Sequence, residues 1–184
     1  MYESHVTIDV ENEQEFLKIC IDNKLKPVII SKDTGSNLKT QYMTAKFHKC
    51  DYNEAYHQMM NIASLFKNVI RRKLEKIVNK NTIINFDFKY KEFHSKFEVD
   101  ENGEDKFLTI IKTHLGHSSV NLMKGEKFKF FTTRDEQLHD QILIILKKDF
   151  KYLGTIREVV IYDDNESIDS NYNCKDCPLK KYVV

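Results

Sequence analysis

The feature that most constrains this chain is an internal duplication. Residues 4–10 read Ser-His-Val-Thr-Ile-Asp-Val and residues 93–99 read Phe-His-Ser-Lys-Phe-Glu-Val, so that His94 follows His5 at an offset of 89 residues. Polar and apolar side chains alternate in both segments, and a period of two is typical of a half-buried strand. The duplication therefore predicts two equivalent strands, each with a histidine on its polar face.

The segments that follow these two strands also repeat in the same order. Helices are expected over 13–23 and 104–115, strands over 27–30, 41–47, 119–123 and 127–133, second helices from 51–54 and 133–136 onward, and closing strands over 69–78 and 155–163. Each half then has the ferredoxin-like order βαββαβ. We expect an α+β protein of two tandem ferredoxin-like βαββαβ repeats, packed as a pseudo-twofold bilobal unit around a central groove. The repeats should occupy residues 1–80 and 81–164, followed by a C-terminal tail over 165–184.

The composition excludes several classes of protein. With 184 residues, 41% of them hydrophobic and 31% charged, the chain matches a globular protein. No apolar run approaches the roughly 20 residues of a spanning helix, and the first residues do not resemble a signal peptide, so we expect a cytoplasmic protein without a membrane partner. The net charge of +1 argues against an extended nucleic-acid surface but leaves room for a local phosphate site.

The paired histidines suggest the chemistry. A pseudo-twofold axis between the halves would place His5 and His94 on the two sides of one groove. Imidazole titrates near neutral pH, so one ring can take a proton from a nucleophile while the other protonates the leaving oxygen of a phosphodiester. Thr7 and Lys96 each follow a histidine by two residues and should point the same way, where a hydroxyl and an ammonium can hold phosphate oxygens.

The segment His5-Val6-Thr7-Ile8 resembles the His-hydrophobic-Thr-hydrophobic motif of the 2H phosphoesterase superfamily, which includes 2′-5′ RNA ligase-like proteins and cyclic phosphodiesterases. The resemblance implies metal-independent opening of a cyclic phosphate, or cleavage of a 2′-5′ linkage, in a small nucleotide or an RNA end. It would make His5 and His94 the acid and base, and Thr7 a phosphate ligand. The second motif departs from the pattern, since Lys96 stands where a Thr or Ser is expected.

Two alternatives stay open. The segment His117-Ser118-Ser119 is a more literal second motif, but it falls on the second strand of its half, so symmetry favours His94. The protein can also be a non-catalytic nucleotide-binding or protein-interaction protein, because a fold alone does not give a function.

Three further residues are candidates for binding substrate. Thr44 and Thr133 lie 89 residues apart on the third strands and could line the groove, although Thr133 is also a plausible helix N-cap. Lys73, with Glu75 on the same face of the closing strand, could orient substrate near the histidines.

The sequence predicts neither a metal nor a cofactor. Cys174 and Cys177 supply two thiolates, whereas a structural zinc site requires four ligands.

Overall fold

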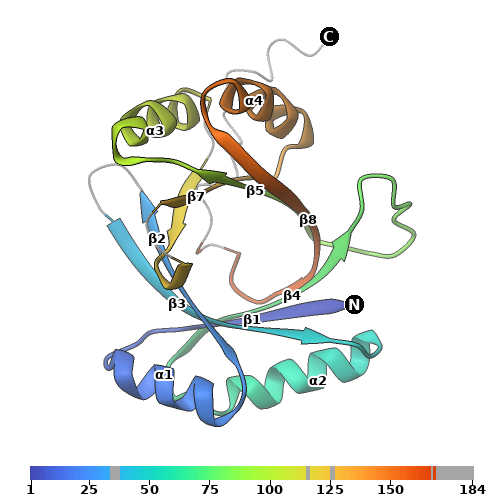
Figure 1. Cartoon of the computed structure of the whole chain (residues 1–184). Helices are drawn as coiled ribbons and strands as arrows, with labels where there is room; N and C mark the ends of the chain where they lie inside the picture. Colours follow the sequence, from blue (N-terminus) through green and yellow to red (C-terminus); the bar gives the residue numbers. More distant parts are fainter. Residues whose placement is uncertain (34–37, 115–116, 125–126, 167, 169–184) are drawn as a thin grey trace.

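Strands and helices follow one another in the order β-α-β-β-α-β, twice along the chain. The computed structural model describes residues 1–33, 38–114, 117–124, 127–166 and 168 (Figure 1). The first half contains β1 (Tyr2–Ile8), α1 (Glu13–Asp22), β2 (Lys26–Asp33), β3 (Leu38–His48), α2 (Tyr52–Ala63) and β4 (Val69–Val78). The second half contains β5 (Tyr90–Glu98), α3 (Glu104–Thr113), β6 (His117–Asn121), β7 (Phe128–Thr133), α4 (Glu136–Asp149) and β8 (Lys151–Asp163). Two short 3-10 turns, η1 (Glu101–Gly103) and η2 (Leu122–Lys124), precede α3 and β7.

The eight strands form one closed antiparallel barrel in the order β1-β3-β2-β6-β7-β5-β8-β4. The predicted fold class, two tandem ferredoxin-like repeats packed as a bilobal unit, is therefore wrong. The periodicity located individual elements, but it carries no information on which strand edges pair. Here β2 pairs with β6 and β4 pairs with β8, so the two halves share a single sheet. Closure gives every strand of the sheet a neighbouring strand on both sides.

The two seams between the halves differ in length. Among the described residues, β4 and β8 are in register over six residue pairs, from Lys73 opposite Asp163 to Val78 opposite Arg157. The seam between β2 and β6 has three pairs, between Ile30 and Lys32 on one strand and their partners on the other. Within the described part of the chain, the seam between β2 and β6 thus has half as many residue pairs as the seam between β4 and β8.

Two hydrophobic cores lie outside the barrel, between its wall and the helices. The helices α1 and α2 cover one side of the barrel and α3 and α4 cover the opposite side (Figure 1). Val6 and Leu74 of the first core and Phe97 and Phe131 of the second are fully buried. Since successive side chains of a strand point to opposite faces, the residues between these apolar ones face the barrel interior, and there the sequence places charged groups.

The N-termini of α1, α2 and α4 are fixed by side-chain caps. The Asp51 carboxylate accepts a hydrogen bond from the Glu54 N–H at 3.0 Å, which confirms the expected start of α2. The expected N-cap at Thr133 is wrong, because α4 begins two residues later. Its N-cap is Asp135, which accepts from the Leu138 N–H at 2.9 Å, and Thr133 stays in β7 as an acceptor for the Asp135 N–H.

In the part of the chain that the structure describes, no helix is both long and apolar enough to cross a membrane. The expected tail at 165–184 lies mostly outside the described residues, and Cys174 and Cys177 lie entirely outside them.

Because one sheet joins both halves, damage to either core should weaken the whole protein. We expect Leu74→Ala and Leu146→Ala, at two fully buried positions in different cores, each to lower the free energy of unfolding by about 2–5 kcal/mol. Both variants should shift the same single urea transition, followed by far-ultraviolet circular dichroism and by tyrosine fluorescence. Two separate transitions, with each variant moving only one, would contradict a barrel that unfolds as a unit.

Candidate active site

The barrel encloses a cavity of about 200 Å³ whose wall has a charged side and a neutral side. The charged side is formed by β1, β4, β8 and β5, which are consecutive in the sheet. The other strands contribute mainly uncharged groups, with Lys26 as the exception. The charged lining residues are Glu3, His5, Lys26, Arg71, Lys73, Glu75, Glu92, His94 and Glu158, and the uncharged ones include Val28, Ile30, Met43, Ala45, Phe130 and Thr132.

Two pairs of glutamates face each other directly across neighbouring strands of this wall. Glu3 of β1 lies opposite Glu75 of β4, and Glu92 of β5 lies opposite Glu158 of β8. All four residues are buried. Like charges directly opposite each other destabilise a sheet, and buried carboxylates require compensation. The barrel interior must therefore supply cations to these two pairs.

A histidine meets each glutamate pair. The Nε2 atom of His5 lies 3.1 Å from a Glu75 oxygen and 3.8 Å from a Glu3 oxygen. In the other half, Nε2 of His94 lies 3.0 Å from Glu158 and 3.4 Å from Glu92. The two halves thus repeat one arrangement, in which an imidazole lies between its own strand's glutamate and the glutamate of the adjacent strand.

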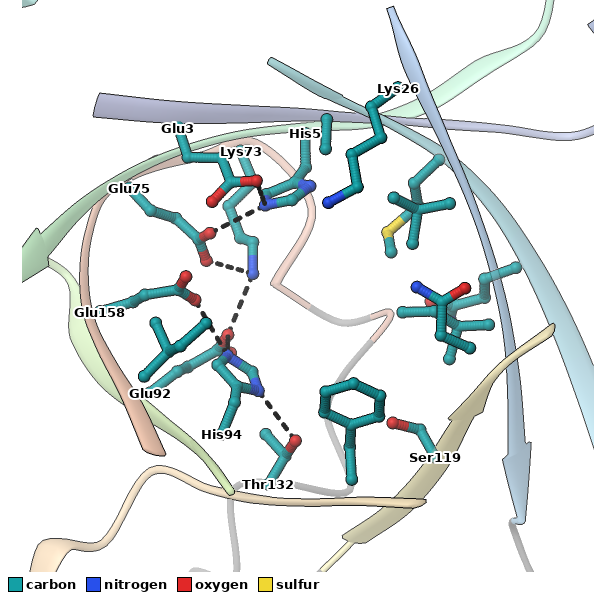
Figure 2. A pocket seen from close by; sticks show the side chains of 18 of the residues that line it. Glu3, His5, Lys26, Lys73, Glu75, Glu92, His94, Ser119, Thr132 and Glu158 are labelled. Carbon is teal, nitrogen blue, oxygen red and sulfur yellow. Dashed lines mark hydrogen bonds and ion pairs between the residues drawn. The ribbon is translucent and has the colours of Figure 1, made fainter. Parts of the chain in front are cut away.

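Lys73 joins the two arrangements into one network. Its ammonium pairs with Glu75 from the first half and lies 3.0 Å from Glu92 of the second half. Figure 2 shows the resulting chain from His5 through Glu75, Lys73 and Glu92 to His94. The two imidazoles line one cavity, yet ion-paired side chains lie between them.

Burial and charge act in opposite directions on the pKa of each histidine. Burial lowers the pKa of His5, but the carboxylates of Glu75 and Glu3 outweigh it and raise the pKa above the ordinary value. Burial likewise opposes the charged form of His94, and Glu158 and Glu92 overcome it and raise its pKa to about 10. The carboxylates therefore favour the charged form of both rings, and His94, with a pKa of about 10, is an imidazolium ion at neutral pH.

The carboxylates of the network respond unequally to this environment. Burial favours the protonated form of Glu75, but Lys73 and His5 lower its pKa to about 2. Glu92, held by Lys73 and His94, has a pKa well below the usual range despite its burial. Glu3 differs, because burial raises its pKa and the nearby His5 only partly offsets the effect. Glu3 is thus the carboxylate of this network whose proton affinity has moved towards neutral pH.

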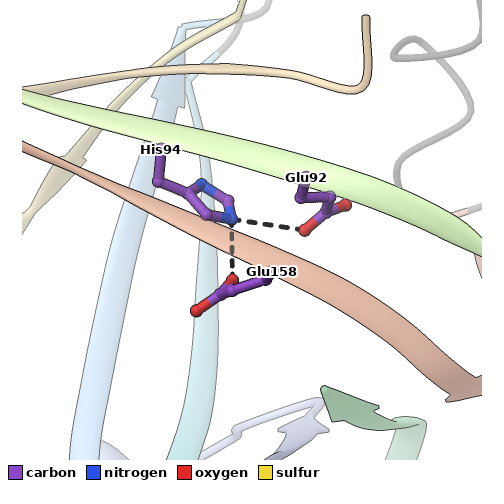
Figure 3. A group of neighbouring side chains, drawn as sticks. All are labelled: Glu92, His94 and Glu158. Atoms are coloured by element: carbon purple, nitrogen blue, oxygen red, sulfur yellow. Dashed lines mark ion pairs between the residues drawn. The ribbon is translucent and has the colours of Figure 1, made fainter. Parts of the chain in front are cut away.

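Glu92, His94 and Glu158 also form the group that best fits a metal ion by position (Figure 3). One ligand atom from each lies within 4.8 Å of the other two. Glu92, however, already pairs with Lys73 at 3.0 Å and with Arg134 at 3.3 Å. Any metal would also have to displace the Nε2 proton that these two glutamates stabilise. The negative charges of Glu92 and Glu158 are thus already balanced by Lys73, Arg134 and the protonated His94, without a metal ion.

Three of the predicted site residues lie on the cavity wall, namely His5, His94 and Lys73. The two histidines come together because the closed sheet turns β1 and β5 towards one interior. Lys73 does not reach into open space for a ligand, since its ammonium is held by two glutamates.

The other four predicted residues do not line the cavity. Thr7 is buried on β1 beyond His5, and Lys96 packs its ammonium over the Phe128 ring at 3.8 Å from the ring centre. Thr44 and Thr133 lie on the outward faces of β3 and β7, one residue away from positions that do line it. For the alternative His117, the backbone pairs with Thr132, and the side chain lies outside the described residues.

The glutamates that face the histidines are the main residues that the sequence interpretation missed. Glu3 and Glu92 stand two residues before His5 and His94, at the same offset of 89 residues. The duplication therefore extends to a Glu-x-His motif, and this signal was available in the sequence. The pairing of each motif with a glutamate of the closing strand required the register of the sheet.

Comparisons with known proteins do not assign this chain to a family. No family model matches, and no curated protein matches. Among solved structures, one that matches is a crystal structure of a "putative monooxygenase" from Fusobacterium nucleatum. The two chains are 13% identical with a TM-score of 0.29, over 87% of this chain and 90% of the other. A likeness of this size carries no argument about function.

Stability should depend on pH through His94. The folded protein keeps the His94 proton up to pH about 10, whereas an unfolded chain releases it near pH 6.5. Folding therefore binds a proton between these values, and stability should fall as pH rises from 6.5 towards 10. In urea titrations at pH 6, 8 and 9.5, we expect the free energy of unfolding to fall more steeply for the natural protein than for His94→Gln. Parallel pH profiles of the two proteins would contradict this account.

Removing the Lys73 ammonium should leave Glu75 and Glu92 without their shared cation. We expect Lys73→Met to lower the free energy of unfolding by about 3–5 kcal/mol, because two buried carboxylates lose a cation that both of them contact. Lys18→Met is the matched control, since Lys18 forms an exposed ion pair with Asp22, and exposed pairs contribute about 0–1 kcal/mol. Equal effects in the two variants, measured by urea unfolding at pH 7, would mean that Lys73 does not hold the network together.

Proposed function

We propose that the barrel cavity is the active site of a metal-independent phosphoesterase, which opens a cyclic phosphate or cleaves a 2′-5′ linkage in a small nucleotide or RNA end. The observation that carries this proposal is the common location of His5 and His94. They come from different halves of the chain and line the same cavity, each against two carboxylates. Such a set can both donate and accept protons.

Opening a cyclic phosphate by water requires two proton transfers. The water oxygen forms a bond to phosphorus while a ring P–O bond breaks, and the leaving oxygen must take up a proton. An imidazolium is the donor for that oxygen, and a carboxylate accepts the proton that the attacking water loses. Glu3 suits the accepting role because burial raises its pKa. Positioned acid and base groups of this kind contribute roughly 10²–10⁴-fold each.

The cavity also offers positive charge that the network does not use. Lys26 lines the cavity from an exposed position at the start of β2, and it forms no ion pair with any described residue. Its charge acts on Glu3, which places it near the His5 arrangement. An anionic phosphate entering the cavity would meet this ammonium without breaking an existing pair.

The cavity volume limits what can be enclosed. An apolar cavity of about 150 Å³ holds benzene, so about 200 Å³ accommodates a phosphate with a small adjoining group. The larger part of a nucleotide would extend out of the barrel. This agrees with a substrate that is recognised at its phosphate end.

Turnover without metal tests the proposal. The protein is incubated in EDTA with 2′,3′-cyclic nucleotides, 3′,5′-cyclic nucleotides and 2′-5′ oligonucleotides, and products are followed by phosphorus NMR. We expect turnover of at least one class, with a loss of at least 100-fold in His5→Ala. The matched control is His57→Ala on α2, an exposed histidine that does not line the cavity, and this variant should leave turnover unchanged.

The other outcomes separate the alternatives. Turnover that requires added Mg²⁺ or Mn²⁺ would contradict the metal-independent mechanism and favour the Glu92, His94 and Glu158 group as a metal site. Binding of a nucleotide without turnover would favour a non-catalytic nucleotide-binding protein. Neither binding nor turnover would favour a protein-interaction role.

A further inference from the structure

The two histidines of the duplicated motif differ in their neighbours on the next strand. In the sheet register, His94 of β5 lies opposite Thr132 of β7, whereas His5 of β1 lies opposite Ala45 of β3. The Thr132 hydroxyl lies 2.9 Å from Nδ1 of His94 and completes the contacts of that ring. The methyl group of Ala45 cannot form a hydrogen bond, so the equivalent contact is missing in the first half.

Nδ1 of His5 consequently has no hydrogen-bond partner among the described residues, although it is buried. Buried polar groups in proteins are nearly always paired, and an unpaired one calls for a ligand or another explanation. The other nitrogen, Nε2, is held by Glu75 and Glu3, so the ring cannot turn without losing these contacts. The unpaired Nδ1 is thus fixed in direction.

The opposite neighbours of the two rings differ in charge as well. Lys73 of β4 lies opposite His5, and Ile156 of β8 lies opposite His94. Lys26, which pairs in register with Ala45, adds a further ammonium on the His5 side. Figure 2 shows Lys26 extending from its strand towards the His5 ring. Among the described residues, a ring nitrogen without a hydrogen-bond partner and an ammonium without an ion pair therefore face the same part of the cavity.

We propose that this place, bounded by Nδ1 of His5, Nζ of Lys26 and the methyl group of Ala45, is the oxyanion site that receives the phosphoryl group. This rests on the proposed function and assigns unequal roles to the two histidines. His5 is the catalytic residue, and its Nδ1–H protonates the leaving oxygen as the P–O bond breaks. Glu3 takes the proton of the attacking water. His94 is a positioning residue, locked by Thr132, that supplies a fixed positive charge to Glu92 and Glu158.

Ala45 allows a direct test, because a side chain placed there can imitate Thr132. Ala45→Thr brings a hydroxyl to the unpaired Nδ1, and Ala45→Val adds the same volume without a hydroxyl. We expect Ala45→Thr to have the higher Tm of the two and to show turnover at least tenfold below Ala45→Val. In the other half, Thr132→Val should lower Tm, because it leaves Nδ1 of His94 unpaired. Equal Tm and equal turnover in the Thr and Val variants at position 45 would overturn the inference.

Binding of inorganic phosphate separates this inference from the proposed function. The chemical shifts of the imidazole nitrogens are followed by NMR during a phosphate titration. We expect the chemical shift of Nδ1 of His5 to change, and those of both nitrogens of His94 to stay constant. Lys26→Met should weaken this binding at least fivefold, and Lys24→Met, at an exposed position two residues earlier, should not. Turnover combined with shifts at His94 would overturn the inference and leave the proposed function standing. Phosphate binding at His5 without any turnover would support the oxyanion site and overturn the proposed esterase.

Discussion

Repulsion between facing glutamates is the constraint on which the barrel interior depends. Two cross-strand pairs, Glu3 with Glu75 and Glu92 with Glu158, place four carboxyl groups on adjoining strands of a buried wall. Such a wall is stable only with cations between the carboxylates, and the two histidines and Lys73 provide them. The raised pKa of each imidazole follows directly from this compensation. The imidazole proton that stabilises the facing carboxylates is thus also a proton that can be donated to a substrate.

The duplication explains why the charged wall consists of two equivalent parts, and the closed sheet explains why these two parts adjoin. Each half contributes a glutamate and a histidine from its first strand and a glutamate from its last strand. The seam between β4 and β8 then sets the two last strands side by side. The function that we propose requires this adjacency, because Lys73 of one half reaches Glu92 of the other.

Sequence patterns could predict local features and could not predict how the edges join. Alternating residues identified the strands that carry His5 and His94, and an offset of 89 residues made the two equivalent. Closure of the barrel depends on pairing between strand edges that are distant in sequence. The periodicity of polar and apolar residues does not show which strands pair. The same limit applies within a strand. Thr133, chosen for its offset of 89 residues from Thr44, lies on the outward face of β7, whereas the neighbouring Thr132 lines the cavity, because a displacement of one residue moves a side chain to the other face of the sheet.

The short seam between β2 and β6 is the place where we expect the barrel to open locally most easily. Three residue pairs hold it among the described residues, against six at the seam between β4 and β8. The strands at the short seam carry the uncharged side of the cavity, so parting them disturbs no buried ion pair of the network. Local opening costs least where the fewest contacts are lost. A ligand too large to enter the closed barrel would accordingly enter between β2 and β6, on the neutral side. The charged side would keep its geometry.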